Sequence, residues 1–598
     1  MRRQRSEGAG DGGAPLAAAA SALRRVPALP LLAVVSPLLL LLGTVQACGV
    51  NAAIADELHY VELVRTFRAG GDWVHMLWAQ HNEHRVVAMK LLIVAVAKWA
   101  SWNQKAEMLA SVALTALLLV GLWGMHRMSG ASSRAVDILA FAPVSFLACS
   151  LSQFENQFYG LMVCHYFTAS GAIVALWLLA RRGIVAVAVA LVAAFVAATS
   201  VGSGLLVFPA GMIVLAARRS GWARWSAWIA SGAITVVLYF RNYVRPPHTT
   251  EIEWTAGSLL EIAKLAAGAL GAPLAAGSLG WAIALAGAFL AVACVVLLLW
   301  LRGPSEERAR TAPLAALLLF GLATCGMIAV GRAFLVHPGD PLGSRYITHA
   351  NLAWFGAYLL LLANARVGRL KPLRTAAWGV LGVGLVAANL HGAVAARAWN
   401  KERLLDQYVL QTVTRQPDSV LTRLGPPEIV RPRALYLYRK GLSAASSPQR
   451  LLMLLDPTLG TPTAEIRRGQ TVVQRLRCTV EQLHDAGVLV LPPHRGGAGS
   501  VSISVAQGRR VLGRVSFPAA AIAGWTWVAV PIEGSARCPG GELEVRIESR
   551  DTPAGTGVML LMAYPFFGGS LSQGSVPMPE DRALGIALNA FHHDILEP

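Results

Sequence analysis

The run PALPLLAVVSPLLLLLGTVQACG, residues 27–49, decides the fold class. It is longer than the core of a signal peptide and long enough to cross a bilayer, so we expect a retained membrane anchor. The whole chain of 598 residues is 55% hydrophobic and 14% charged, with a mean hydropathy of +0.51. A soluble protein of this size would be less apolar, so we predict a polytopic α-helical membrane protein.

Further apolar runs follow the first, and short Arg-rich turns separate many of them. Two additional stretches, 86–101 and 258–273, are short and contain Lys or Glu. We expect these two to be interfacial or re-entrant helices on the outer side, the alternative being that one or both span the membrane. The sequence thus predicts about 11 to 13 transmembrane helices. The main apolar runs are 27–49, 107–126, 135–151, 159–180, 184–199, 203–217, 225–241, 278–301, 312–334, 348–365 and 375–397.

The net charge of +19 lies mostly in short loops, where Lys and Arg orient a membrane protein with these loops toward the cytoplasm. Gathered in one patch, such charge would suggest nucleic-acid binding, but this distribution does not. Residues 1–26 are basic and rich in small residues, which predicts a disordered cytoplasmic tail. The N-terminus is then expected inside and the C-terminus outside. The basic residues on the predicted cytoplasmic side include Arg2, Arg3, Arg5, Arg24, Arg25, Arg127, Arg134, Arg181, Arg182, Arg218, Arg219, Arg224, Arg302, Arg308, Arg310, Arg366, Arg369, Lys371 and Arg374.

The predicted outer loops carry a different chemistry, with acids, amides, His, Tyr and Arg gathered on one face. The stretch IADELHYVELVRTFRAGGDWVHMLWAQHNEHRVV begins directly after the first apolar run and is the richest in ionisable groups. A protein that acts on something outside the cytoplasmic membrane would show this one-sided pattern. The outer segments are 54–87, SQFENQFYG at 152–160, TSVGSG at 199–204, RNYVRPPHTTEIEW at 241–254 and HPGDPLGSRYITH at 337–349.

Within the first outer segment, Asp56 and Glu57 are acids next to a bilayer, where carboxylates are solvated, paired or functional. One of them could take a proton from an acceptor hydroxyl, and a solvated loop acid is the alternative. In HNEHR, the pair His81 and His84 with Arg85 suits phosphate binding, because Arg offers a planar fork and His a titratable donor. A water-exposed helix cap is the alternative. A divalent metal bound by this motif is a further alternative, but no third ligand stands at a fixed spacing from the two histidines.

Two other outer segments hold candidate binding residues. Arg345, in Ser-Arg-Tyr, suits an anionic headgroup, although it could equally snorkel to the interface, and the adjacent Tyr346 is a candidate for sugar or acceptor binding. Gln153, Glu155 and Asn156 lie among aromatic residues, a combination that binds sugar hydroxyls and rings; loop solvation is the alternative.

The domain organisation follows from where the apolar runs end. We predict a transmembrane module at 27–398 with a large first outer loop at 50–106, and then a helical and Pro-rich connector at 399–464. From 465 to 598, short alternating runs between Gly and Pro turns predict an antiparallel β-sandwich. Cys478 and Cys538 are the two cysteines of this part, and a disulfide between them is plausible if it lies outside the cell.

Together these features resemble the GT-C superfamily of membrane glycosyltransferases, similar in plan to protein O-mannosyltransferases and lipid A aminoarabinose transferases. The matching motif is ADELHY, an acidic pair just after the first helix, with 86–101 in the place of an interfacial helix. The predicted sandwich resembles the carbohydrate-binding-like domains of some bacterial members.

The resemblance implies a polyprenyl-phosphate sugar as donor and a glycan, lipid or protein as extracytoplasmic acceptor, at the cytoplasmic membrane of a bacterium. Asp56 would be the general base, with Glu57 beside it, and transfer would invert the anomeric carbon. From their position and charge, Arg85, His84 or Arg345 would stabilise the departing phosphate, with His81 as a further candidate. The absence of nucleotide-binding motifs agrees with such a donor, and the resemblance implies no cofactor.

Three other classes stay open. A glycolipid or polysaccharide transporter or flippase would also need polar helix ends, but the chain shows no internal repeat and its polar residues are one-sided. A membrane-anchored glycan-binding protein would leave the crowded outer loops unexplained. A membrane O-acyltransferase would need a catalytic His within a span, where His391 is a lone residue.

Overall fold

The structure is a computed structural model and divides the chain into two compact units. The first comprises Met1–Val50 and Glu62–Asn400, and the second comprises Asn51–Val61 and Lys401–Pro598. The segment Asn51–Val61, part of the predicted first outer loop, therefore groups with the C-terminal part. The described residues are 28–246, 254–333, 342–365, 371–411, 413, 418–446, 461–462, 471–477, 482–491, 499–521, 526–537, 542–550, 559–563, 570–573, 576–577, 583–584 and 586–588.

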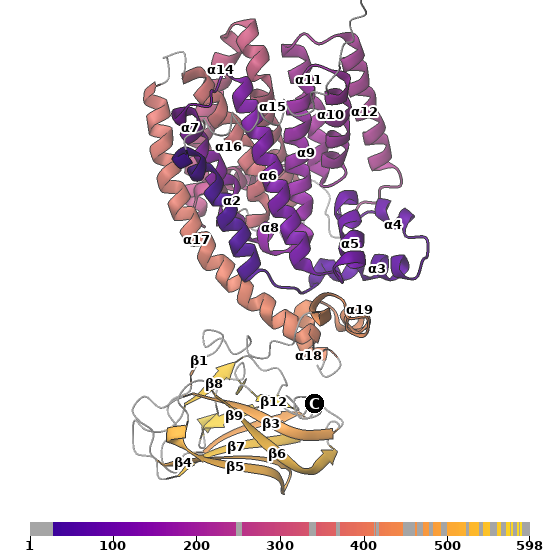
Figure 1. The fold of residues 1–598 in the computed structure, drawn as a ribbon, viewed down its shortest axis with the longest axis vertical. Coiled ribbons are helices and arrows are strands. Elements are labelled where there is room, and N and C mark those ends of the chain that lie inside the picture. The colour runs from indigo at the N-terminus through magenta and orange to yellow at the C-terminus, as the bar shows by residue number, and fades with distance from the viewer. Residues whose placement is uncertain are drawn as a thin grey trace, which may run out of the picture. The chain divides into compact units, whose positions relative to one another are not determined.

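The first unit is a bundle of helices (Figure 1). Within the described residues, eight helical segments are long and apolar enough to cross a membrane, and the protein is thus a multi-pass membrane protein. These segments are α2 (Ala28–Cys48), α6 (Gln104–Met128), Ala135–Phe158 with α7 (Ala135–Ala148), η2 (Leu151–Gln153) and α8 (Phe154–Phe158), Gly160–Leu179 with η3 (Gly160–Met162) and α9 (Val163–Leu179), α14 (Leu279–Arg302), α15 (Ser305–Ala333), Ser344–Asn364 of α16 (Ser344–Ala365), and Trp378–Gln411 of α17 (Lys371–Gln411).

Three predicted apolar runs form helices outside that group of eight. They are α10 (Ile184–Ala198), η4 (Gly202–Leu206) with α11 (Val207–Ala217), and α12 (Trp222–Phe240). With 15 residues, α10 is short. That is about 22 Å of helix, against a hydrocarbon core of about 30 Å. All three pack on neighbouring helices of the bundle, α9, α10, α11 and α12 among them (Figure 1).

The two shorter apolar stretches are helical as well. They form α5 (Val87–Trp99), with 13 residues, and α13 (Ala256–Gly271), with 16 residues, followed by η5 (Ala272–Leu274). Neither is among the membrane-length segments of the described chain. Together with α3 (Val61–Arg68) and α4 (Val74–Trp78), α5 lies at one end of the bundle (Figure 1).

Helix α16 is the least apolar of the eight segments, yet its span is entirely buried in the bundle. Small residues make this position possible, because they let backbones approach closely. A Cβ added to Gly321 of α15 would lie 2.2 Å from the Ala353 nitrogen, and one added to Gly356 would lie 2.5 Å from the Leu318 nitrogen. The polar side chains of α16 are thus held inside the bundle.

The interhelical connections form two chemically different ends. At one end, Arg218 Nη1 donates to Ala309 O at 3.1 Å, and Arg181, Arg182 and Arg224 lie near enough to affect Arg218 electrostatically. At the other end lie the loops that the sequence singled out for His, Tyr, amides and acids, and the candidate site forms there.

The second unit contains a small helical part. It comprises η1 (Ala55–Tyr60), the residues of α17 after Asn400, α18 (Asp418–Leu421), η6 (Thr422–Leu424), α19 (Pro427–Arg439) and η7 (Ser443–Ser446). The segment before η1 is tied to η7. The Asn51 side chain donates to Ser443 O at 2.7 Å, and the Ala53 nitrogen donates to Ser443 Oγ at 2.8 Å.

The C-terminal strands pair antiparallel in two sheets, ordered β1-β8-β3-β12, with β11 on β8 and β6 on β3, and β10-β9-β2-β7-β4-β5. Alternating strand residues such as Val501, Ile503 and Val505 enter one apolar core, to which both sheets contribute. The short alternating runs predicted after residue 465 lie on strands β2 to β8. Cys478 and Cys538 lie outside the described residues. The elements are β1 (Thr461–Pro462), β2 (Thr471–Arg477), β3 (Gln482–Leu491), β4 (Ser500–Gln507), β5 (Arg510–Pro518), η10 (Ala519–Ala521), β6 (Thr526–Arg537), β7 (Glu542–Arg550), β8 (Met559–Ala563), β9 (Ser570–Gln573), β10 (Val576–Pro577), β11 (Ala583–Leu584) and β12 (Ile586–Leu588).

Candidate functional site

A cavity of about 670 Å³, here called the central cavity, lies where four of the predicted outer segments meet. Its polar wall combines His, Arg, Tyr, Ser and Glu, and its apolar wall comes mainly from α15 and the end of α12. No predicted outer segment forms it alone. Its lining residues are Glu83, His84, His165, Val201, Gly202, Ser203, Leu205, Tyr239, Phe240, Tyr243, Arg245, Pro246, Met327, Ile328, Val330, Gly331, Arg332, Tyr346 and His349.

Two histidines from different helices meet in the wall of the central cavity. His165 is on the first turn of α9, and His349 is on the second turn of α16. The Nδ1 atom of His165 lies 2.8 Å from Nε2 of His349, so the two rings share one hydrogen bond. Three His line the cavity, but the described residues contain no group of three His, Cys, Asp or Glu placed to hold a metal ion.

His84 is positioned by a tight turn. The backbones of His81 and His84 pair through bonds of 2.7 and 2.8 Å, and Asn82 between them has a φ of 48°, a conformation that Asn tolerates. The Gly202 nitrogen donates to His84 Nδ1 at 3.2 Å, so the neutral ring carries its proton on Nε2. Burial is the main cause that lowers the pKa of His84 below its usual 6.5.

The cationic part of the wall comes from Arg332 and Arg245. The Arg332 guanidinium carbon lies 5.1 Å from the centroid of the Tyr346 ring, a cation–π contact. Glu83 is the acid among the described residues that line this cavity. A ligand with an anionic group and an apolar tail could thus contact Arg side chains with the first and the apolar wall with the second.

Arg85 holds the surrounding loops together. Its Nε, Nη1 and Nη2 atoms donate to Tyr239 O, Trp78 O and Arg241 O at 2.9, 2.9 and 2.6 Å, and its side chain is buried. These carbonyls end α4 and α12, where the last turn of a helix leaves its C=O groups unpaired. A cation also suits the negative end of a helix dipole.

Lys90 also donates to backbone carbonyls, at the C-terminal end of α4. Its ammonium donates to Met76 O at 3.2 Å, to Leu77 O at 3.3 Å and to Ala79 O. Burial, with Arg85 nearby, lowers the pKa of Lys90 to about 7. The segment just before His84 is therefore held by the buried side chains of Arg85 and Lys90.

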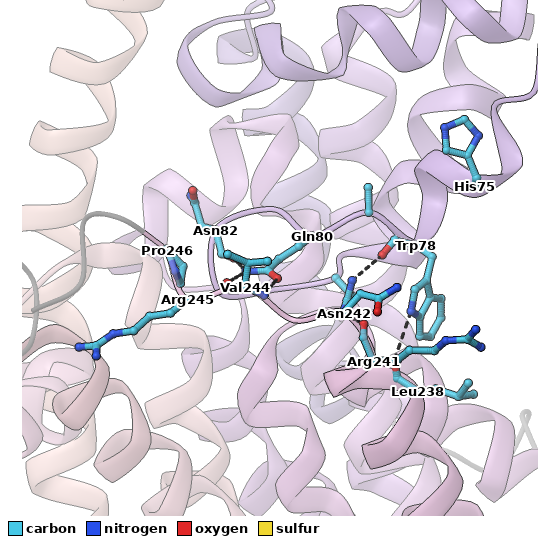
Figure 2. Close-up of a pocket in the computed structure, with 12 residues that line it drawn as sticks. His75, Trp78, Gln80, Asn82, Leu238, Arg241, Asn242, Val244, Arg245 and Pro246 are labelled. Atoms are coloured by element: carbon cyan, nitrogen blue, oxygen red, sulfur yellow. Dashed lines mark hydrogen bonds between the residues drawn. The ribbon is translucent and has the colours of Figure 1, made fainter. Parts of the chain in front are cut away.

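A second cavity of about 870 Å³ adjoins the first, and Arg245 and Pro246 line both. Figure 2 shows Gln80 against Val244, where its Nε2 donates to Val244 O at 2.6 Å and its Oε1 accepts from the Val244 nitrogen at 3.0 Å. In this view Arg245 extends to the side opposite Trp78 and His75 (Figure 2). Arg85 and Arg241 also line it, and its described lining residues include no acid.

The predicted sugar-binding residues of SQFENQ contact the start of α16. Thr348 Oγ1 donates to Gln153 Oε1 at 2.7 Å, and Asn156 Nδ2 donates to Arg345 O at 3.0 Å. Glu155 accepts from Ser344 Oγ at 2.6 Å and from the Arg345 nitrogen at 3.2 Å. Their observed contacts position α16; sugar binding by them stays a prediction.

The other predicted residues lie apart from the central cavity or in the other unit. Arg345 and Glu155 line a third cavity of about 360 Å³, which also includes His391. His81 is not among the lining residues of these three cavities. Asp56 and Glu57 belong to the second unit, where Glu57 is buried and accepts from the Ile54 nitrogen at 3.0 Å, and Asp56 is half-buried.

Of the predicted site residues, the structure brings His84 and Tyr346 together in the central cavity. It adds His165, His349, Arg332 and Ser203, which were not among the predicted site residues. The signal for His165 and His349 was available, because an ionisable residue inside an apolar run is a functional candidate by default. Comparison of the chain with protein-family models finds no match, and neither does comparison with curated proteins.

Proposed function

We propose that the protein is an integral-membrane glycosyltransferase that moves a sugar from a polyprenyl-phosphate donor to a hydroxyl of an extracytoplasmic acceptor. The observation that carries the proposal is the central cavity, which is cationic and polar on one wall and apolar on the other. A lipid-linked sugar phosphate has the same two parts.

The donor would lie with its phosphate at Arg332 and Arg245 and with its polyprenyl chain along the apolar wall. Charge-assisted hydrogen bonds from Arg to phosphate are strong, and they strengthen as charge develops on a leaving group. Phe240 and Met327 line this wall and are 52% and 44% exposed, so they offer apolar surface to such a chain. Arg85 takes a positioning role here in place of the predicted phosphate binding, since three of its nitrogens already donate to carbonyls.

The reaction forms a bond between the acceptor oxygen and the anomeric carbon and breaks the bond from that carbon to the phosphate oxygen. The acceptor proton passes to a carboxylate, and polyprenyl phosphate leaves with the electron pair. The resemblance to the GT-C motif predicts Asp56 as the base, and Glu83 is the carboxylate that, among the described residues, lines the central cavity itself. Glu57 would be a local cap, because its carboxylate already accepts from Ile54.

The proposal places the cavity end of the bundle outside the cytoplasmic membrane of a bacterium, with about 11 spans and the N-terminus inside. The two C-terminal sheets would then form an extracytoplasmic β-sandwich that is carbohydrate-binding-like. Their shared apolar core supports a sandwich.

The test uses the purified protein in nanodiscs with polyprenyl-phosphate sugars and a cell-envelope acceptor fraction. Arg332→Gln should weaken donor binding about tenfold or more, because it removes a charge from the phosphate site. The matched control is Arg181→Gln, since Arg181 also makes a cation–π contact, to Trp177 at 5.4 Å, at the other end of the bundle. Asp56→Asn should keep donor binding and abolish transfer.

The outcomes separate the alternatives. Loss of transfer in Glu83→Gln but not in Asp56→Asn would move the base to Glu83 and leave the enzyme class standing. The transporter alternative is measured in sealed proteoliposomes. A wild-type protein that carries lipid-linked sugar across their bilayer without transfer, and that Asp56→Asn does not affect, would be a transporter.

A further inference from the structure

The His165–His349 pair offers the central cavity a matched donor and acceptor. Because Nδ1 of His165 and Nε2 of His349 share one hydrogen bond, one ring donates its N–H and the other accepts it. In the neutral pair, the two remaining nitrogens are then one donor and one acceptor, whichever ring donates. These roles swap, with no change in charge, only when the shared proton crosses, the outer donor nitrogen loses its proton and the outer acceptor nitrogen gains one.

Two polar atoms in the cavity wall have no hydrogen-bond partner among the described residues. They are Nδ1 of His349 and Oγ of Ser203, whose residues are 0% and 3% exposed. Buried polar atoms are nearly always hydrogen-bonded, so two such atoms in the lining residues of one cavity point to a ligand that supplies the missing partners. Both come from segments held by close packing. A Cβ on Gly204, next to Ser203, would lie 1.9 Å from Ala197 O.

The chemistry of this wall selects among ligand groups. A sugar hydroxyl both donates and accepts, and so matches an imidazole pair that offers one of each and a serine that offers both. A carboxylate accepts hydrogen bonds but donates none, so it would leave the acceptor nitrogen of the histidine pair without a donor. An ammonium would have to lie in the cavity that Arg332 and Arg245 line.

We propose that His165, His349 and Ser203 form the sugar-recognising part of the central cavity and select an uncharged, hydroxylated sugar headgroup. The inference rests on the proposed function, in which Arg332 and Arg245 bind the phosphate of the same donor. Phosphate binding and sugar recognition are thereby assigned to different side chains.

The experiment measures binding of four lipids to the full-length protein in nanodiscs by native mass spectrometry. The lipids are polyprenyl phosphate alone and polyprenyl phosphate carrying glucose, glucuronate or an aminosugar. His349→Phe and Ser203→Ala should each weaken binding of the glucose lipid about tenfold, the effect of one lost hydrogen bond, and leave the sugar-free lipid unchanged. Arg332→Gln should weaken all four lipids.

His126→Phe is the matched control, because His126 is also fully buried but packs against Trp123 and Phe141 outside the cavity. Wild-type protein that binds glucose and glucuronate lipids equally would overturn the inference, as would variants that weaken the sugar-free lipid as much as the glucose lipid. Ser203→Ala keeps the test decisive if His349→Phe does not fold. Wild-type protein that binds none of the four lipids would overturn the proposed function itself.

Discussion

Single buried cations hold the loops around the central cavity, and Arg85 connects the most segments. It joins the end of α4 to the end of α12 through three carbonyls, although these residues are far apart in the sequence. Its neighbour Val86 has a φ of 47°, a left-handed conformation that is strained for a β-branched residue. The three hydrogen bonds of Arg85 therefore also hold a strained turn next to His84.

Arg85→Lys should lower the stability of the folded protein by about 2 kcal/mol, because one ammonium cannot reach three carbonyls that lie in different directions. The measurement is the thermal unfolding temperature in detergent, with donor binding measured in parallel. Unchanged stability with lost donor binding would instead support the predicted phosphate-binding role of Arg85.

The stability of the fold should depend on pH through His84. Burial holds its pKa below 6.5 in the folded state, so the unfolded chain takes up a proton first as the pH falls. The contribution of neutral His84 to the free energy of unfolding is therefore fully present above pH 6.5, and it is lost as the pH falls below that value. His84→Asn keeps an acceptor for the Gly202 nitrogen but cannot titrate.

Unfolding temperatures of the wild type and His84→Asn, measured from about pH 8 to pH 5, check this expectation. The wild type should lose more stability below pH 6.5 than the variant does. Parallel curves for the two proteins would mean that His84 titrates alike in the folded and unfolded states.

At the scale of elements, the contact between α15 and α16 decides the geometry of the cavity, because α15 carries Arg332 and α16 carries Tyr346 and His349. Small residues set how closely the two helices approach. Gly321→Ala should destabilise the protein by about 2–3 kcal/mol, because its Cβ would lie 2.2 Å from the Ala353 nitrogen. It should also weaken donor binding.

Gly326→Ala on the same helix is the control. Nothing lies within 4 Å of a Cβ at Gly326, and Ala has the higher helix propensity, so stability should stay equal or rise slightly. Equal effects of the two substitutions would show that helix propensity, not interhelical contact, governs this pair.

At the scale of the whole chain, more of the helix and strand organisation than of the candidate site could be predicted from the sequence. The apolar runs lie on helices, and the alternating runs after residue 465 lie on antiparallel strands, because hydrophobic length and period are local properties. The grouping of Asn51–Val61 with Lys401–Pro598 was not predicted. It depends on hydrogen bonds between residues almost four hundred positions apart, such as Asn51 and Ser443.

The candidate site shows the same division. By itself the sequence determined a multi-pass helical bundle and the ionisable outer segments, including His84 and Tyr346, because these follow from composition and position. Only the tertiary structure decided that His165 meets His349, that Arg332 faces Tyr346, and that Arg85 donates to carbonyls. Such pairs come from distant helices, and they form because close packing of small residues and buried hydrogen bonding bring those helices into register.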